Sequence, residues 1–123
     1  MAARGRPFFS EIFAANLDSL RLFLEPKGRS AFRRLLNRLF DDIVPTLCRF
    51  PKLGRPFLDH TVGSVEAQAL LERLKAALRR GDDLREFVVE EYIILYLVKR
   101  NRPYFLAIKH HRQLSFDFKH FWP

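Results

Sequence analysis

The sequence is poor in the residues that build disulfides, metal sites and phosphate-binding loops. Cys48 is the single cysteine of 123 residues, which excludes an intramolecular disulfide and a cysteine-based metal site. The four histidines lack the spacing of zinc motifs, and the adjacent pair His110 and His111 would point to opposite faces of a strand. The five glycines form no glycine-rich loop before a helix. We therefore expect neither a metal ion nor a nucleotide or other small-molecule cofactor.

Long apolar runs and a secretion signal are missing as well. The longest apolar run, Tyr92–Val98, is far too short to span a membrane. Residues 1–7 include Arg4 and Arg6, but no apolar run follows them, so they do not form a secretion signal. The expectation is a cytoplasmic protein without a membrane partner.

Positive charge and phenylalanine are abundant. The formal net charge is +8 and the isoelectric point is about 10.3, which favours a polyanion or an acidic protein as partner and says nothing about the fold. Hydrophobic residues make up 48% of the chain, enough for one folded domain over residues 1–123 with a modest core. Most of the 13 phenylalanines are expected in that core, because their side chains have no polar tip.

Apolar residues recur at helical spacing through the first 47 positions and predict two helices. Ser10 is placed to cap the first helix, which should end at residues 25–28, where Pro26 and Gly28 stand. Ser30 is expected to cap the second helix, and Pro45 to kink or interrupt it near Ile43. Because the connection is short, the two helices should form an antiparallel hairpin.

The second half of the chain predicts one more helix and then a sheet. Ser64 is expected to cap an inserted helix over residues 64–80. Both alternating faces of the segment Tyr92–Lys99 are apolar, so it should be a central strand buried on both sides. The predicted fold class is α+β, with an N-terminal helical hairpin packed on a small, mostly antiparallel sheet and an extra helix inserted before the sheet. The expected strands are Leu84–Val89, Tyr92–Lys99 and Tyr104–His110, with breaks at Glu90-Glu91 and Asn101-Arg102-Pro103, and a short extra strand is possible at Arg6–Phe9.

The residues that could carry chemistry gather at the end of the last strand. A histidine exchanges protons near neutral pH and an arginine holds a phosphate through a forked pair of hydrogen bonds, so together they could cleave RNA by general acid–base catalysis. The alternative is a solvated strand end, or a patch that binds an acidic partner. The candidates are Lys109, His110, His111 and Arg112 with Arg85, Tyr92 and Tyr96.

Four short motifs, in this order, carry a family resemblance. They are Phe50-Pro51-x-x-Gly54-Arg55-Pro56 after the hairpin, Leu84-Arg85-Glu86-Phe87, Tyr92-x-x-Leu95-Tyr96, and Ile108-Lys109-His110-His111-Arg112. With them, the chain from Phe8 to Phe118 resembles the RelE/ParE toxin superfamily of bacterial type II toxin–antitoxin modules. The resemblance implies a small cytoplasmic toxin that is neutralised by a cognate antitoxin, which wraps the toxin with a helix and often an added strand.

The superfamily implies two possible targets. RelE-like members cut messenger RNA on the ribosome, and the resemblance would then make His111 and Arg112 catalytic. ParE-like members inhibit DNA gyrase and are not nucleases. Ile93 stands where RelE-like members typically carry a phosphate-holding arginine, and the Phe50–Pro56 motif is more similar to the ParE side. The prediction is therefore a gyrase-binding toxin, with a ribosome-dependent messenger RNA endoribonuclease as the alternative.

Two surfaces are predicted to bind partners. Arg85, Lys109, His111 and Arg112 should share one face of the sheet and contact the target. The aromatic tail, residues 113–123, should pack on its own sheet or contact the antitoxin. The candidate antitoxin-binding residues of the tail are Phe116, Phe118 and Trp122.

A third hypothesis does not depend on the family. It takes the chain as a basic nucleic-acid-binding module that uses the strand end and the arginine-rich second helix.

Overall fold

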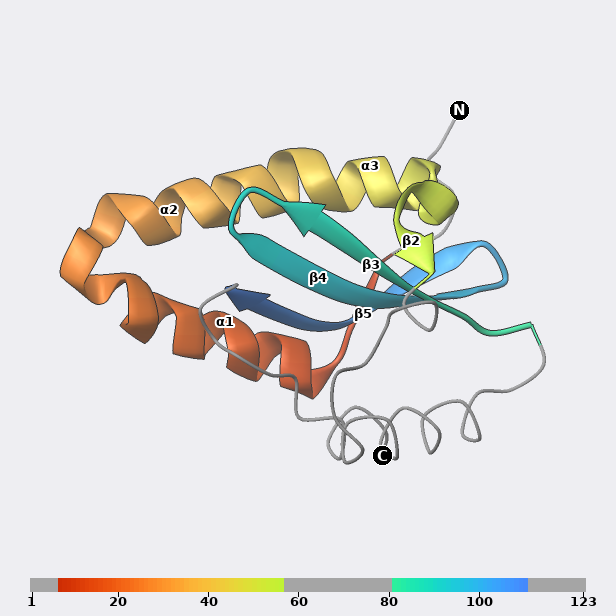
Figure 1. The fold of residues 1–123 in the computed structure, drawn as a ribbon, viewed down its shortest axis with the longest axis horizontal. Coiled ribbons are helices and arrows are strands. Elements are labelled where there is room, and N and C mark those ends of the chain that lie inside the picture. Colours follow the sequence, from red (N-terminus) through yellow and green to blue (C-terminus); the bar gives the residue numbers. More distant parts are fainter. Residues whose placement is uncertain (1–6, 57–80, 111–123) are drawn as a thin grey trace.

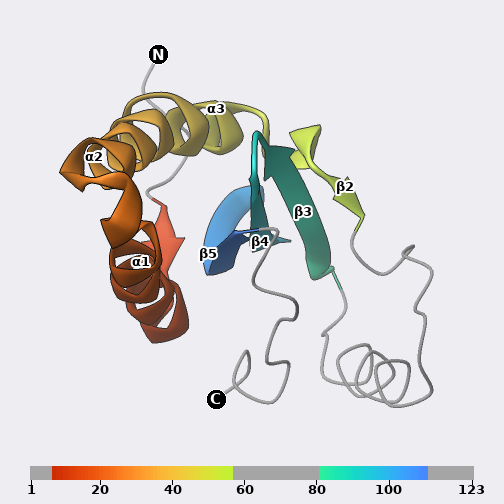
Figure 2. The same ribbon diagram turned by 60° about the vertical axis from the view of Figure 1, so that its left-hand side comes forward.

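The computed structural model describes residues 7–56 and 81–110 of the chain. In this part three helices lie on one face of a five-stranded sheet, so the predicted α+β class is confirmed (Figures 1 and 2). The helices are α1 (Glu11–Leu24), α2 (Arg29–Arg38) and α3 (Val44–Arg49), and the strands are β1 (Phe8–Phe9), β2 (Arg55–Pro56), β3 (Asp83–Val89), β4 (Tyr92–Lys99) and β5 (Arg102–His110).

The start of α1 follows the prediction and the start of α2 does not. The Ser10 hydroxyl accepts a hydrogen bond from the Phe13 amide at 3.0 Å and caps α1. The predicted cap by Ser30 is wrong, because Gly28, with φ at +92°, already turns the chain from a 3-10 turn (η1, Glu25–Lys27) into α2. Ser30 lies in the first turn of α2, where its hydroxyl accepts a bond from Arg34 at 3.4 Å.

The second helix continues into α3 through a π-helical turn (η2, Leu39–Ile43). Pro45 has no amide hydrogen for the helical ladder, and the amide of Val44 bonds to the carbonyl of Leu39, five residues back. The predicted interruption near Ile43 is thus confirmed as a widened turn within a continuing helix. Together with α1, this long element forms the predicted antiparallel hairpin (Figure 1).

The sheet has the strand order β1-β5-β4-β3-β2. Its pairs are antiparallel except β1 with β5, so the sheet is mostly antiparallel, as predicted. Arg102 and Pro103 belong to β5 rather than to a turn, because Arg100 and Asn101, both with positive φ, already form the two-residue turn between β4 and β5. The short strand β2 pairs with β3 and is not among the strands that the sequence predicted.

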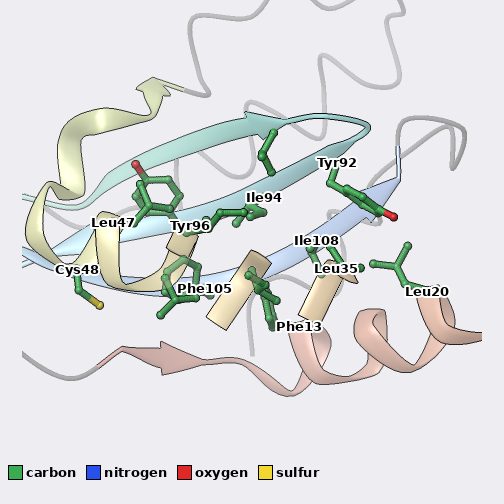
Figure 3. Close-up of a cluster of buried hydrophobic side chains, with 14 of the residues drawn as sticks. Phe13, Leu20, Leu35, Leu47, Cys48, Tyr92, Ile94, Tyr96, Phe105 and Ile108 are labelled. Atoms are coloured by element: carbon green, nitrogen blue, oxygen red, sulfur yellow. The ribbon is translucent and has the colours of Figure 1, made fainter. Parts of the chain in front are cut away.

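The main core lies between the helices and the facing side of the sheet (Figure 3). Phe13, Leu20 and Leu47 from the helices meet Tyr96 and Phe105 from the sheet, all almost fully buried. The alternate residues of β4, Leu95 and Leu97, are buried too, so the prediction of a central strand covered on both sides is confirmed.

Helix α1 is joined directly to the outer edge of β5. The Ser10 amide donates to the Phe105 carbonyl at 2.9 Å, and the Ser10 hydroxyl donates to the Leu106 carbonyl at 2.8 Å. Farther along, the buried side chain of Asn16 accepts a hydrogen bond from the Ile108 amide at 3.0 Å. These bonds satisfy backbone groups that an edge strand would otherwise leave unpaired.

Two predicted features, the inserted helix over residues 64–80 and the aromatic tail over residues 113–123, lie outside the described residues. In the described ranges, no helix is long and apolar enough to cross a membrane.

Candidate functional site

The 3-10 turn after α3 (η3, Pro51–Leu53) is held by the hydroxyl of Tyr96, a fully buried residue of the central strand. This hydroxyl donates to the Pro51 carbonyl at 2.6 Å and accepts the Gly54 amide at 2.9 Å. Burial raises the pKa of Tyr96, although the Gly54 hydrogen bond and the charge of Arg85 act in the opposite direction. The phenol therefore stays protonated at neutral pH and remains a donor.

Arg85 holds the same turn from β3. Its guanidinium donates to the carbonyls of Gly54 and of Lys52, the latter at 3.2 Å, and forms an ion pair with Asp83 at 2.8 Å. The side chain is only 16% exposed. Arg85 thus has a structural role that the sequence analysis missed, and its role in target binding stays a prediction.

Gly54 has no room for a side chain. A Cβ atom there would lie 2.5 Å from both the Glu86 carbonyl oxygen and the Tyr96 hydroxyl, closer than such atoms approach in proteins. The next residue, Arg55, pairs with the buried carboxylate of Glu86 at 2.9 Å. The motif at residues 50–56 therefore has a structural explanation. We call the turn Pro51–Gly54, with Arg85 and Tyr96 that hold it, the η3 lock.

One sequence signal pointed to this lock. A tyrosine in a strand buried on both sides needs a hydrogen-bond partner for its hydroxyl. The partners, Pro51 and Gly54, lie more than 40 positions earlier in the chain, so the local pattern around Tyr96 does not identify them.

The structure does not bring the predicted target-binding residues to one face. Arg85 pairs with Tyr96 and faces the helices, whereas Lys109 pairs with Ile93 on the opposite side of the sheet. The cause is a register shift between Leu95 and Tyr96, where β5 contains one extra residue. Without this bulge Lys109 would pair with Tyr92 on the helix side. The predicted common face is therefore wrong for this pair, and the other two members, His111 and Arg112, lie outside the described residues.

The bulge also places His110 in the core rather than on a cationic surface. His110 is 1% exposed and packs against the rings of Phe23 and Tyr92, with centroids 4.9 Å and 5.2 Å away. Its Nε2 lies 3.3 Å from a carboxylate oxygen of Glu91. Of the strand-end cluster, His110 is thus removed from any surface that could receive a polyanion.

The two tyrosines considered for catalysis are poor bases in this setting. Tyr92 is 8% exposed, and its pKa is raised by burial and by the carboxylates of Glu91 and Glu90, against a smaller effect of Arg34. The pKa of Tyr96 is raised as well. A tyrosine that accepts a proton near neutral pH needs a lowered pKa, so neither side chain is prepared for this role.

In the described part of the chain, neither Cys48 nor a metal site provides a catalytic centre. Burial raises the pKa of the Cys48 thiol, with a smaller opposing effect of Arg102, so the thiol is protonated at neutral pH. Within residues 7–56 and 81–110, no three histidine, cysteine or carboxylate side chains gather into a group that could hold a metal ion.

Two grooves flank α2, and both combine apolar and basic side chains. The first, of about 470 Å³, lies between the hairpin and the β3–β4 turn, and we call it the turn groove. The second, of about 830 Å³, lies along α2 near the end of α1, and we call it the hairpin groove. The turn groove is lined by Leu24, Lys27, Ala31, Arg34, Leu35, Asn37, Arg38, Ile43, Val89, Glu90, Glu91 and Tyr92, and the hairpin groove by Arg21, Glu25, Gly28, Arg29, Phe32, Arg33, Leu36 and Asn37.

Residues 8–115 match the family described as "ParE toxin of type II toxin-antitoxin system, parDE". The chain belongs to the ParE toxin family. The match runs from β1 through β5, includes the η3 lock and confirms the resemblance seen in the sequence motifs. No curated protein matches the chain significantly. As a ParE toxin, the chain is the toxin component of a type II toxin–antitoxin system.

Proposed function

We propose that this ParE-family toxin inhibits growth by binding DNA gyrase, without chemistry of its own. The observation that carries the proposal is the family match over residues 8–115. The cytoplasm, where gyrase works, is the proposed location. The alternative of a basic nucleic-acid-binding module explains the charge but gives no reason for the shared motifs.

The environments of Arg85 and Tyr96, two of the residues considered for catalysis, support binding rather than RNA cleavage. Arg85 and Tyr96 serve the η3 lock, and the pKa of Tyr96 is raised. Ile93, at the position where RelE-like members carry an arginine, has an apolar side chain that cannot hold a phosphate.

The proposed antitoxin is an acidic, amphipathic segment that folds onto the toxin. The turn groove offers such a segment apolar side chains that include Leu35 and Val89, and basic groups at Lys27 and Arg34 on the hairpin side, opposite the carboxylates of the β3–β4 turn. A disordered acidic segment would gain apolar burial there, and charge complementarity along the hairpin side. Phe116, Phe118 and Trp122 remain proposed contacts of the antitoxin.

The test of the target compares two reactions with the purified wild-type toxin. A gyrase supercoiling assay should show inhibition at toxin concentrations that leave messenger RNA on translating ribosomes uncut. If the toxin cuts this RNA, and His111→Ala with Arg112→Ala abolishes the cuts while ribosome binding persists, the ribonuclease alternative replaces gyrase binding.

The test of the antitoxin uses the small acidic protein expected from the neighbouring reading frame. Arg34→Glu should weaken its binding at least about 10-fold, since an attraction becomes a repulsion. Arg100→Glu, on the β4–β5 turn away from the turn groove, is the control with the same charge change. Equal effects of both variants would show that only the overall charge matters and would reject the groove.

A further inference from the structure

Two large apolar side chains are exposed at the η3 turn, one at each end of it. Phe50 is 60% exposed and Leu53 is 53% exposed, and the Leu53 amide bonds to the Phe50 carbonyl at 3.0 Å. This bond closes the turn, so Phe50 and Leu53 stand at its two ends, only three positions apart. A single exposed apolar residue is ordinary, but a pair of this size on one short turn indicates a contact surface.

The η3 lock makes this exposed turn rigid. The buried Tyr96 hydroxyl holds Pro51 and Gly54, and Arg85 holds the carbonyls of Lys52 and Gly54. The turn therefore presents Phe50 and Leu53 in a fixed arrangement before any partner arrives. Preorganisation of this kind lowers the entropic cost of binding.

The charged side chains of the segment that carries the turn are all positive. Arg49 and Lys52 are exposed beside the two apolar residues, and the segment from Arg49 to Pro56 contains no acidic residue. The carboxylate that pairs with Arg55, that of Glu86, is only 2% exposed and so presents little negative charge to a partner. A surface of this composition fits a partner with an apolar pocket and an acidic rim.

We propose that Arg49, Phe50, Lys52 and Leu53, the η3 surface, form the contact through which the toxin holds its target, an acidic protein surface with an apolar pocket. The inference rests on the proposed function, because it assumes that toxicity arises from binding a protein. Nucleic acid is disfavoured as the occupant, because a phosphate backbone would bind Arg49 and Lys52 but would make no favourable contact with the apolar side chain of Leu53. The η3 surface shares no residue with the turn groove or the hairpin groove, so it stays available as a site separate from the proposed antitoxin contact.

The experiment compares three variants of the full chain with the wild type. The double change Phe50→Ser and Leu53→Ser removes the apolar pair, and Arg49→Glu with Lys52→Glu reverses the charges. The matched control, Leu22→Ser with Val88→Ser, removes two apolar side chains of similar exposure, 55% and 52%, elsewhere on the surface. Each variant is measured for growth arrest on induction, thermal unfolding, and binding to gyrase, to the antitoxin, to duplex DNA and to single-stranded RNA.

We expect both η3 variants to relieve growth arrest and to lose target affinity at least about 30-fold, as hot-spot residues do. Their unfolding temperature and antitoxin binding should equal those of the control, which should stay toxic. Full toxicity of the apolar variant overturns the inference, as does loss of antitoxin binding together with toxicity. A third outcome would also overturn the inference. If only the charge-reversal variant lost toxicity, and lost DNA or RNA binding with it, the surface would be assigned to nucleic acid.

Failure of the proposed target is distinguishable from failure of the η3 surface. If the wild-type toxin arrests growth but leaves supercoiling intact, gyrase is rejected, and the variants still decide whether the η3 surface holds another protein. If gyrase is inhibited equally by the wild type and the apolar variant, gyrase stands and the η3 surface is rejected. A wild-type chain that does not arrest growth would reject both.

Discussion

Tyr96 is the residue on which the η3 lock depends most. Its ring belongs to the main core (Figure 3). Its hydroxyl is both donor and acceptor for one turn of the chain. Removal of that oxygen would leave the Pro51 carbonyl and the Gly54 amide without their partner. Unsatisfied buried backbone groups are more costly than the net gain of an average hydrogen bond.

We predict that Tyr96→Phe lowers the free energy of unfolding at neutral pH by about 1–3 kcal/mol. Because folding raises the pKa of Tyr96 above its ordinary 10.0, its contribution is present below pH 10 and is lost as the pH rises through the folded pKa. The stability gap between the wild type and the variant should thus narrow above pH 10. Urea unfolding at several pH values measures this difference in the free energy of unfolding, with Tyr104→Phe as the control. A difference that widens as the pH rises would contradict the role of the protonated Tyr96 hydroxyl as a donor.

Arg85 gives a second prediction at this scale. Arg85 bonds to Asp83 through Nε and to both carbonyls through Nη1, and the single ammonium of a lysine cannot occupy both positions, so Arg85→Lys should cost about 1–2 kcal/mol of stability. Arg100→Lys, at an exposed turn, should change stability by less than about 0.5 kcal/mol. If Arg85→Lys retained full stability but lost growth arrest, Arg85 would act on the target rather than in the lock.

At the scale of elements, the contact of α1 with the edge of β5 stands out. Ser10 caps the helix and bonds to the strand with the same hydroxyl, so helix start and sheet edge are fixed together. The sequence predicted the cap, because serine before a helical apolar pattern is a local signal. It could not predict the bond to Leu106, which lies 96 positions later.

The prediction for this contact is that Ser10→Ala lowers the free energy of unfolding by about 1–3 kcal/mol, because one change removes a helix cap and leaves a strand carbonyl unpaired. Ser19→Ala, on the exposed side of the same helix, is the control and should change stability by less than about 0.5 kcal/mol. Chemical denaturation of both variants is the measurement. A cost for Ser10→Ala no greater than that for Ser19→Ala would show that the two bonds contribute nothing.

Strand register explains where the sequence analysis succeeded and where it failed. The apolar alternation of Tyr92–Lys99 predicted a central, doubly buried strand, and the structure confirms it. The faces of Arg85 and Lys109, however, depend on a bulge at the middle of β5 that no turn or glycine in the sequence marks. One extra residue reverses the face of every side chain beyond it. His110 therefore lies in the core, and Lys109 lies on the face opposite to Arg85.

For the molecule as a whole, the dominant property is its net charge of +8. A net charge of this size accelerates encounter with an acidic partner and is screened by salt. The helices and the order of the main strands followed from local patterns, whereas the η3 lock and the grooves needed contacts between distant segments.

We predict that the association rate with the acidic antitoxin falls at least about 10-fold when salt is raised from about 50 mM to about 500 mM, while the dissociation rate changes much less. Stopped-flow mixing of the full-length toxin with the antitoxin measures both. An association rate independent of salt would show that the net charge does not guide the encounter.

The η3 lock also determines when, during synthesis of the chain, the toxin becomes able to bind its target. It joins residues between 31 and 45 positions apart, so it forms only after the chain through Tyr96 has been made and β3 has paired with β4. Before that point, Arg85 and Tyr96 do not yet hold the turn that carries Phe50 and Leu53. If the η3 surface holds the target, a nascent toxin is harmless for most of its synthesis, and the antitoxin has that interval in which to be made.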